Sequence, residues 1–503
     1  MDINWKKLQN GSDMRGVALE GIEGEPVNLN SEVVEILGKS FVKWLNNKGL
    51  GKISIAIGMD SRLSGPALKT AFIKGAKKQG ADIYDCGLSS TPAMFMATLS
   101  TKISVNASVM LTASHLPFNR NGLKYFTKNG GLDKKDITEI LEIAEKGVFD
   151  SNNKVGDEQK YQLIDEYAEN LVNIIREKAN SKINYAKPLE GMKIIVDAGN
   201  GAGGFFADKI LKPLGADIEG SQFLEPDGNF PNHIPNPEDS NAMESVCEAV
   251  KKAKADFGVI FDTDVDRSAV VDKQGNPINR NSLIALISAI ILEEHPGSTI
   301  VTDSITSEGL AWFINEKLKG KHHRFKRGYK NVINESIRLN ENGESSWIAI
   351  ETSGHAALKE NHFLDDGAFL VAKLLVKLAQ MREQGKYLAD LIDELPLPVE
   401  SEEFRIGIKE PEFAPYGNKV LKEAGKYSEN MNGWSLEPNN YEGIRVRCQN
   451  ENEQGWFLLR MSLHDPVIPL NIESNIEGGV KIIGEKLKNF LESFKGLEIS
   501  SLK

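Results

Sequence analysis

Residues 53–65 read ISIAIGMDSRLSG, an apolar run that ends in Asp60 and small polar residues. Such a run, rich in isoleucine, predicts a buried strand that leads into a turn. The next residues, PALKTAFIKGAKKQGA at 66–81, carry apolar side chains at helical spacing, and ADIYDCGLSSTP at 81–92 supplies another short strand before Pro92. Strand, helix and strand in this order are typical of a parallel or mixed sheet with helices on both faces.

Two later segments repeat this design, KIIVDAGNGAGG at 193–204 and TIVTDSITSEG at 299–309. Three such openings favour three related α/β units with mixed sheets over one continuous sheet. The pattern changes from about Ser401, where strand-like stretches follow one another and residues 478–494 close the chain with an amphipathic helical pattern. This change predicts a smaller α+β domain at the C-terminal end.

The chain of 503 residues is long enough for three or four domains, at roughly 150 residues each. A charged helical pattern before Pro188 predicts a connecting helix, and Pro396 and Pro398 interrupt a later helical pattern. We therefore expect an α/β protein of four domains, three related α/β units and a smaller α+β unit. The expected domains are residues 1–187, 188–297, 298–396 and 397–503.

The composition excludes several classes of protein. Sixty Lys and Arg residues are outnumbered by 71 Asp and Glu residues, and the net charge of −11 disfavours binding to nucleic acid. The three cysteines lie far apart, so a disulfide framework or a C-x-x-C pair is absent and a reducing compartment is expected. Because the sequence has no signal-like or transit-peptide-like start and no apolar stretch of membrane-spanning length, we expect a cytoplasmic protein with no membrane partner.

The segment LTASHLPFNRNGLKYF at 111–126 places Ser114 and His115 in a loop between apolar flanks. Such a loop can present a hydroxyl to a substrate. A serine hydroxyl needs a base or a cation before it attacks or accepts a phosphoryl group, and His115 and Lys124 are the nearby candidates. The alternative is that Ser114 only caps a turn, because short motifs recur by chance.

The segment GVIFDTDVDRSAVVD at 258–272 places Asp262, Asp264 and Asp266 at alternate positions directly after an apolar strand. In extended backbone this alternation puts all three carboxylates on one side. They repel one another unless a hard divalent cation lies among them, and oxygen ligands select Mg²⁺ or Ca²⁺. An EF-hand would need glycine at the sixth position, where this chain has Arg267. A solvated acidic turn is the alternative.

Two further segments carry polar groups after strands. In WIAIETSGHAALKENHFLDDGAFL, Glu351, Ser353 and His355 surround a glycine, and a carboxylate with a hydroxyl is a common way to hold sugar hydroxyls. A second acidic turn follows at Asp365 and Asp366. The alternative is the capped start of a helix.

In GWFLLRMSLHDPVIPLNIES, Arg460, Ser462 and His464 alternate at a strand end and suggest an anion clamp, because arginine binds phosphate oxygens bidentately. The runs NGSDMRG with Arg15 and GMDSRLSG with Arg62 have the character of phosphate-contacting turns. A surface strand pair and surface salt bridges are the alternatives.

Taken in order, these segments resemble the α-D-phosphohexomutase superfamily, the phosphoglucomutases and phosphomannomutases, along nearly the whole chain. The TASH segment resembles the phosphoserine loop of that family, DTDVDR its Mg²⁺ loop, ETSGH its sugar-binding loop and RMSLHDP its R-x-S-x-T-E-P phosphate-binding loop. GMDSRLSG, GLSSTP and KRGYKNVI match further family segments. The resemblance implies four domains around a central cleft, in a monomer or a dimer.

The resemblance also implies roles for individual residues. Ser114 carries the phosphoryl group as phosphoserine, Lys124 transfers a proton with the substrate hydroxyl, and Arg267 neutralises the transferring group, as phosphoryl transfer requires. The implied catalytic residues are Ser114, His115, Lys124, Arg15 and Arg267. The implied ligands of one Mg²⁺ ion are an oxygen of the Ser114 phosphate and the carboxylates of Asp262, Asp264 and Asp266. The implied substrate-binding residues are Lys330, Glu351, Ser353, His355, Arg460, Ser462 and His464.

The chain departs from the family pattern in the phosphate-binding loop. Leu463, His464 and Asp465 stand where the family has a small residue, threonine and glutamate. Leucine prevents the close backbone approach that glycine permits, and histidine replaces a hydroxyl donor with a bulkier ring. A reshaped clamp would release a sugar bisphosphate more easily, as the related glucose 1,6-bisphosphate synthases do.

We therefore expect a Mg²⁺-dependent phosphotransferase that makes glucose 1,6-bisphosphate from a hexose monophosphate and a sugar bisphosphate donor such as fructose 1,6-bisphosphate. The first alternative is a conventional mutase that interconverts glucose 1-phosphate and glucose 6-phosphate, or the mannose phosphates, with a sugar bisphosphate as activator. The second alternative is a sugar-phosphate sensor without catalysis.

Overall fold

The structure, a computed structural model, describes residues 3–149, 155–462 and 465–502. The chain forms two compact units, each built from segments that lie far apart in the sequence. The first unit comprises Met1–Arg280 and Ser353–Asp390, and the second comprises Asn281–Thr352 and Leu391–Lys503. Throughout the described residues, every helix is too short or too polar to cross a membrane.

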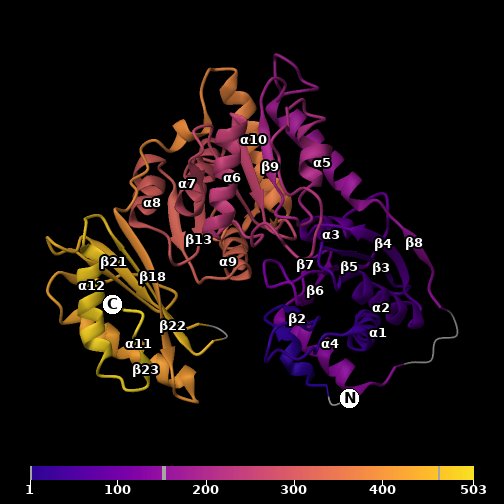
Figure 1. Ribbon diagram of the computed structural model, residues 1–503, viewed down its shortest axis with the longest axis horizontal. Helices are drawn as coiled ribbons and strands as arrows, with labels where there is room; N and C mark the ends of the chain where they lie inside the picture. The colour runs from indigo at the N-terminus through magenta and orange to yellow at the C-terminus, as the bar shows by residue number, and fades with distance from the viewer. Residues whose placement is uncertain (1–2, 150–154, 463–464, 503) are drawn as a thin grey trace. The chain divides into compact units, whose positions relative to one another are not determined.

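The N-terminal part of the first unit is a mixed sheet covered by helices (Figure 1). The strands in the middle of the sheet and at one edge are parallel, whereas the strands toward the opposite edge are antiparallel. The strand–helix–strand pattern predicts such a parallel or mixed sheet. From edge to edge the strands are β1 (Gln9–Asn10), β2 (Asp13–Val17), β6 (Arg120–Thr127), β5 (Ala107–Leu111), β3 (Ser54–Met59), β4 (Asp82–Leu88) and β8 (Glu158–Lys160), with β7 (Gly130–Gly131) on β6. The helices are α1 (Ser31–Asn47), α2 (Gly65–Lys78), α3 (Thr91–Ala97) and α4 (Lys134–Lys146).

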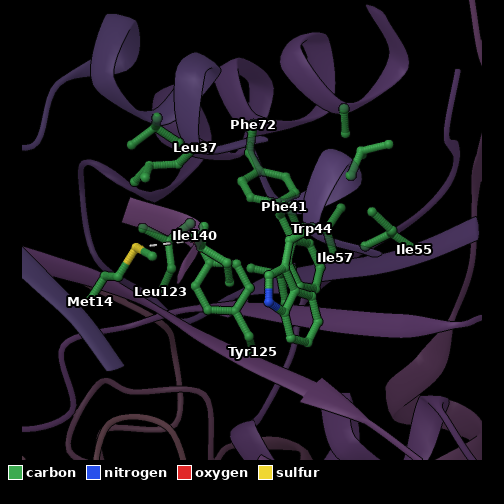
Figure 2. Packing of buried hydrophobic residues seen from close by; sticks show 14 of the residues in the cluster. Met14, Leu37, Phe41, Trp44, Ile55, Ile57, Phe72, Leu123, Tyr125 and Ile140 are labelled. Atoms are coloured by element: carbon green, nitrogen blue, oxygen red, sulfur yellow. Dashed lines mark hydrogen bonds between the residues drawn. The ribbon is translucent and has the colours of Figure 1, made fainter. Parts of the chain in front are cut away.

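The core of this part lies between the sheet and helices α1, α2 and α4 (Figure 2). The rings of Phe41 and Tyr125 lie 4.7 Å apart between their centroids, and the Tyr125 hydroxyl lies 3.5 Å from the sulfur of Met14. Burial of aromatic side chains contributes a large share of the apolar stabilisation of a core. This core fixes strands β5 and β6, which carry the loop with Ser114 between them.

Helices α1 and α2 approach closely through two glycines. A Cβ atom at Gly38 would collide with the carbonyl oxygen of Phe72, and one at Gly75 would collide with that of Glu35. The same approach lets the Glu35 carboxylate reach Lys74 Nζ at 2.6 Å and Lys78 Nζ at 2.8 Å. These hydrogen bonds lower the pKa of Glu35 to about 2.

Replacing Glu35 by glutamine is expected to lower the free energy of unfolding at pH 7 by about 1 kcal/mol, since solvent screens the pairs. The folded-state pKa lies below the unfolded value, so the stabilisation is present above about pH 4.5 and is lost as the pH falls toward 2. Urea unfolding at pH 7 and at pH 3 measures the change. Glu142→Gln, on an exposed position of α4, is the control, and an equal loss at both pH values would refute the ion-pair explanation.

The remainder of the first unit contains a second sheet and two long helices. Strand β10 runs parallel to β9 and antiparallel to β11, and α10 packs against α5. The strands are β12 (Pro277–Ile278), β11 (Ser268–Val271), β10 (Phe257–Phe261) and β9 (Ile194–Asp197), and the pair β16 (Ala356–Leu358) and β17 (Leu364–Asp365). The helices are α5 (Leu163–Ala179), α6 (Ser240–Ala253), α10 (Gly367–Arg382) and the π-helical turn η2 (Phe206–Leu211).

The second unit joins a parallel sheet to an antiparallel one. In the first, β13 (Thr299–Thr302) lies between β14 (Lys321–Arg324) and β15 (Ser346–Ile350). The antiparallel sheet is the predicted C-terminal α+β part, with strands β19 (Trp434–Leu436), β20 (Ile444–Cys448), β21 (Gly455–Leu459), β22 (Val467–Ser474), β18 (Glu400–Ile408) and β23 (Leu497–Glu498). The helices are α7 (Arg280–Glu294), α8 (Glu308–Trp312), α9 (Tyr329–Glu341), α11 (Phe413–Glu429) and α12 (Gly479–Leu491), with the π-helical turn η3 (Phe313–Lys317).

The three predicted strand openings are all strands, β3, β9 and β13. Helices follow the first and third directly, whereas β9 leads through a glycine-rich turn into η2. The fold class predicted from the sequence, α/β with a smaller α+β C-terminal domain, is therefore confirmed. The four domain boundaries remain predictions.

Candidate active site

The loop between β5 and β6 presents Ser114. This residue has a φ of 51°, a left-handed conformation that is uncommon for a residue with a side chain, and it is buried. Its hydroxyl donates to Asp262 Oδ2 at 3.0 Å and accepts from Arg267 Nη2 at 2.7 Å. The Ser114 side chain is thus directed at the aspartate turn rather than capping its own loop.

The three aspartates converge, but not in the way the sequence pattern predicts. Strands β10 and β11 are antiparallel neighbours, so the chain reverses between them, and Val265 has a φ of 67°. The expectation of extended backbone at Asp262, Asp264 and Asp266 is therefore wrong, because a tight turn lies there. The turn still gathers one oxygen of each carboxylate within 4.8 Å of the others, and all three residues are buried.

Cationic side chains surround this turn and offset the repulsion among its carboxylates. Burial and repulsion from Asp266 and Asp264 raise the pKa of Asp262 well above its ordinary value. Burial would also raise the pKa of Asp266, but Lys124, His355 and Arg267 together hold it below its ordinary value. Lys124 Nζ, on β6, lies 3.0 Å from Asp264 Oδ2 and 2.5 Å from Asp266 Oδ2.

The residues of the turn fit a hard divalent metal ion. Among the described residues, Asp264 Oδ1 and Asp266 Oδ1 are buried without a hydrogen-bond partner. Asp264 is held in place by Thr91, whose hydroxyl donates to Oδ2 at 2.5 Å and whose N–H donates to the Asp264 carbonyl at 2.8 Å. Buried carboxylate oxygens that lack donors suit Mg²⁺, which prefers oxygen ligands.

Arg267 connects the aspartate turn to the serine loop. Its Nε and Nη2 donate to Asp262 Oδ2 at 3.1 and 3.0 Å, and Nη2 also lies 2.5 Å from His115 Nδ1. Its Nη1 donates to Asn236 Oδ1 at 3.2 Å. Asn236 is not among the residues predicted from the sequence, where its local signal is its place in the Asn- and Pro-rich run PNHIPNPED.

His115 is uncharged at neutral pH. Burial and the nearby positive charges of Arg267 and Arg15 lower its pKa to about 2. Arg15 lies on β2, with Nη2 3.6 Å from Asp13 Oδ2. Since the neutral His115 ring nitrogen can accept the Arg267 N–H, His115 orients Arg267 as a hydrogen-bond acceptor.

His355 lies against the aspartate turn. Its Nδ1 is 2.6 Å from Asp365 Oδ2 and 3.7 Å from Asp266 Oδ1, and its backbone forms a β-bridge with Arg267. Asp365 and Asp266 outweigh burial and raise the pKa of His355 to about 9. His355, predicted to bind the sugar, is therefore ion-paired beside the predicted metal ligands. This placement depends on Asp365, which lies ten residues further along the chain.

The other predicted substrate-binding residues divide between the two units. Ser353 is a buried residue of the first unit, whereas Glu351 belongs to the second, where its Oε1 accepts from the Gly328 N–H at 2.6 Å at the start of α9. Lys330 lies in the first turn of α9. The neighbouring Arg327, not identified from the sequence, places Nε 3.9 Å from Asp303 Oδ2.

The phosphate-binding segment of the second unit is only partly described. Arg460 is 9% exposed, and its Nε has no hydrogen-bond partner among the residues that the structure describes. Burial, and then the positive charge of Arg327, lower the pKa of Arg460. Ser462 Oγ accepts from the Asp465 N–H at 3.2 Å. Leu463 and His464 lie outside the described residues.

Comparisons with known proteins agree with this fold. Models of the α/β/α domains I, II and III of phosphoglucomutase/phosphomannomutase match residues 6–151, 165–275 and 279–398. The phosphoglucomutase of Neisseria gonorrhoeae is 30% identical over 476 residues, which are 94% of this chain and 95% of that protein. The phosphomannomutase/phosphoglucomutase of Pseudomonas aeruginosa PAO1 is 28% identical over 483 residues, 96% of each chain.

A solved structure of a phosphoglucomutase/phosphomannomutase family protein from Burkholderia thailandensis superposes with a TM-score of 0.79 and 26% identity, over 98% of both chains. The architecture is thus the four-domain phosphohexomutase fold. The chain belongs to the phosphoglucomutase/phosphomannomutase family. The superfamily resemblance seen in the sequence is confirmed, and the comparisons do not single out its glucose 1,6-bisphosphate synthase branch.

Proposed function

We propose that this protein transfers a phosphoryl group between Ser114 and a hexose phosphate, with Mg²⁺ as cofactor. One observation carries the proposal, namely that a buried serine hydroxyl lies within hydrogen-bond distance of both Asp262 and Arg267. Relatives named phosphoglucomutase and phosphomannomutase support glucose and mannose phosphates as the substrate class.

The proposed step moves the phosphoryl group from phospho-Ser114 to a sugar hydroxyl. The bond between Ser114 Oγ and phosphorus breaks as the bond from the sugar oxygen forms. The sugar hydroxyl loses a proton and Ser114 Oγ gains one. Lys124 is our candidate for the proton transfer with the sugar hydroxyl. Arg267 neutralises charge on the transferring group.

Asp262, Asp264 and Asp266, with an oxygen of the phosphoserine, would hold the Mg²⁺ ion. When bound, the ion supplies positive charge to the phosphoryl oxygens. The close packing of Lys124, His355 and Arg267 around the turn, at the distances given above, keeps the carboxylates oriented.

We assign the substrate contacts as the family resemblance implies. Glu351 and Ser353 would hold sugar hydroxyls, and Lys330, Arg460, Ser462 and His464 would hold the phosphate that is not being transferred. The buried Nε of Arg460, without a protein partner in the described chain, supports an anionic ligand there.

Replacing Arg460 by methionine is expected to raise the KM for glucose 1-phosphate by about tenfold or more, because a charge-assisted hydrogen bond is lost. The kcat should change less, since Arg460 belongs to the binding segment. Steady-state kinetics measure both values. Arg338→Met is the matched control, because that arginine is exposed and pairs with Glu335 in the preceding turn of α9. An unchanged KM would remove Arg460 from the binding site.

The fate of the bisphosphate defines two candidate functions. Leu463, His464 and Asp465, which replace the family's small residue, threonine and glutamate, favour release of glucose 1,6-bisphosphate. The names of the relatives favour a mutase that retains it. We retain the synthase as the specific proposal, with the conventional mutase as its alternative.

Phosphorus NMR distinguishes the two functions. The protein is incubated with Mg²⁺ and glucose 1-phosphate, together with either fructose 1,6-bisphosphate or a trace of glucose 1,6-bisphosphate. Stoichiometric glucose 1,6-bisphosphate from the fructose donor would establish the synthase. Rapid formation of glucose 6-phosphate with only trace bisphosphate would establish the mutase instead. Absence of both products would refute phosphoryl transfer on glucose phosphates.

A further inference from the structure

Arg62 is one of the most completely buried charged residues of the first unit, with a side chain that is 0% exposed. The sequence pattern suggests a phosphate contact for it, but its guanidinium is directed into the protein. Nη1 donates to the carbonyl oxygens of Pro117 at 2.8 Å and Arg120 at 2.9 Å. Nη2 donates to those of Leu116 at 2.6 Å and Ser114. The terminal nitrogens of Arg62 therefore bind four main-chain carbonyls of the serine loop.

The positive charge of Arg62 is balanced by the carboxylate of Asp60. The Arg62 Nε lies 3.4 Å from Asp60 Oδ2, and the main-chain N–H of Arg62 donates to Asp60 Oδ1 at 3.0 Å. The guanidinium carbon lies 5.4 Å from the ring centre of Phe230, within cation–π range. A buried ion pair is costly to desolvate, and it contributes little net stability unless its remaining donors are satisfied. Here the Nη1 and Nη2 donors of Arg62 are satisfied by one loop.

The loop that Arg62 holds has a strained serine. Ser114 adopts a φ of 51°, which costs energy for a residue with a Cβ and persists only where the surroundings impose it. The Ser114 carbonyl accepts from Arg62, and the Ser114 N–H donates to Thr112 Oγ1 at 2.9 Å. The main-chain N–H and carbonyl groups of Ser114 are thus both held by hydrogen bonds, which fixes the direction of its Cα–Cβ bond.

We propose that Arg62 is a positioning residue for phosphoryl transfer, whose guanidinium holds the serine loop so that Ser114 Oγ faces Arg267 and Asp262. This inference rests on the proposed function of Ser114. Arg62 acts through the loop main chain and does not touch the substrate. Lysine has the charge but cannot bind four carbonyls from a planar fork.

The test compares Arg62→Lys and Arg62→Met with the wild type. Single-turnover transfer from phospho-Ser114 to glucose 1-phosphate should slow by about 100-fold, as expected when a reacting atom is misplaced. The KM for glucose 1-phosphate should stay within about threefold, because the substrate contacts are not altered. Arg120→Met is the matched control, since its half-exposed guanidinium pairs with Glu25 and leaves the loop carbonyls to Arg62.

A second measurement separates positioning from a general effect on stability. Hydrogen exchange of the folded Arg62→Lys protein should speed up in residues 112–120 and stay unchanged in the core strands. The inference would be overturned if the Arg62→Lys protein transferred phosphate and exchanged its loop hydrogens at the wild-type rates. It would also be overturned if the fraction of unfolded protein accounted for the whole loss of transfer rate. Absence of phosphate transfer in the wild type itself would instead refute the proposed function, so the two failures are distinguishable.

Discussion

Replacing Ser114 by alanine is expected to reduce phosphoryl transfer by on the order of 10⁴-fold or more, because the hydroxyl proposed to carry the phosphate is lost. The substitution removes one hydroxyl and adds no volume, so the far-ultraviolet circular dichroism should not change. The rate of product formation from glucose 1-phosphate measures the loss. Intact-mass analysis should show a phosphate on the wild type that disappears on incubation with a hexose monophosphate, and no phosphate on the alanine variant.

Ser108→Ala is the matched control for this experiment. Ser108 is a fully buried serine of β5, and its hydroxyl donates to the carbonyl of Met94 rather than to the aspartate turn. Its variant should keep transfer near the wild-type rate. Normal transfer by the Ser114 variant would remove both candidate enzyme functions. A wild type that neither carries nor transfers a phosphate would favour the sugar-phosphate sensor.

Replacing Asp264 by asparagine is expected to lower turnover by on the order of 10³-fold and to weaken Mg²⁺ binding, because the proposed metal ligand loses its charge. Asparagine is nearly isosteric and can still accept the Thr91 hydroxyl, so the turn should remain folded. Turnover measured against Mg²⁺ concentration, and calorimetric titration of the protein with Mg²⁺ alone, provide two independent readouts.

The control for the metal site is Asp272→Asn. Asp272 follows β11 in an exposed turn, where its Oδ1 accepts from the N–H groups of Gln274 and Asn276. This variant should bind Mg²⁺ as the wild type does. An Asp264 variant with unchanged turnover at saturating Mg²⁺ would contradict our metal assignment.

The sequence predicts much of this architecture because hydrophobic periodicity is a local property. The strands at 54–59, 194–197 and 299–302 follow from runs of β-branched residues, and α2 follows from apolar spacing. The helix after β9 was less predictable, since the glycine-rich turn precedes a π-helical rather than an α-helical segment. Its form depends on packing against the sheet, which the local pattern does not contain.

The chemistry of the site could be predicted by residue type, whereas its geometry could not. Three alternating aspartates indicate a cation, but the turn at Val265 depends on the antiparallel pairing of β10 with β11. The contacts of Arg62 could not be predicted, because the carbonyl groups that it binds lie more than fifty residues along the chain. The placement of His355 against Asp266 likewise depends on tertiary contacts.

The ammonium of Lys124 between Asp264 and Asp266 has a further consequence for how the protein is assembled. Lys124 supplies a positive charge within the acidic turn, so we expect the protein to fold without a bound metal ion. Small zinc domains differ, because they are unfolded without metal. Treatment with a chelator should therefore abolish turnover while leaving the thermal melting curve nearly unchanged. The proposed Mg²⁺ ion would then serve the chemistry alone, and its loss would be reversible without refolding.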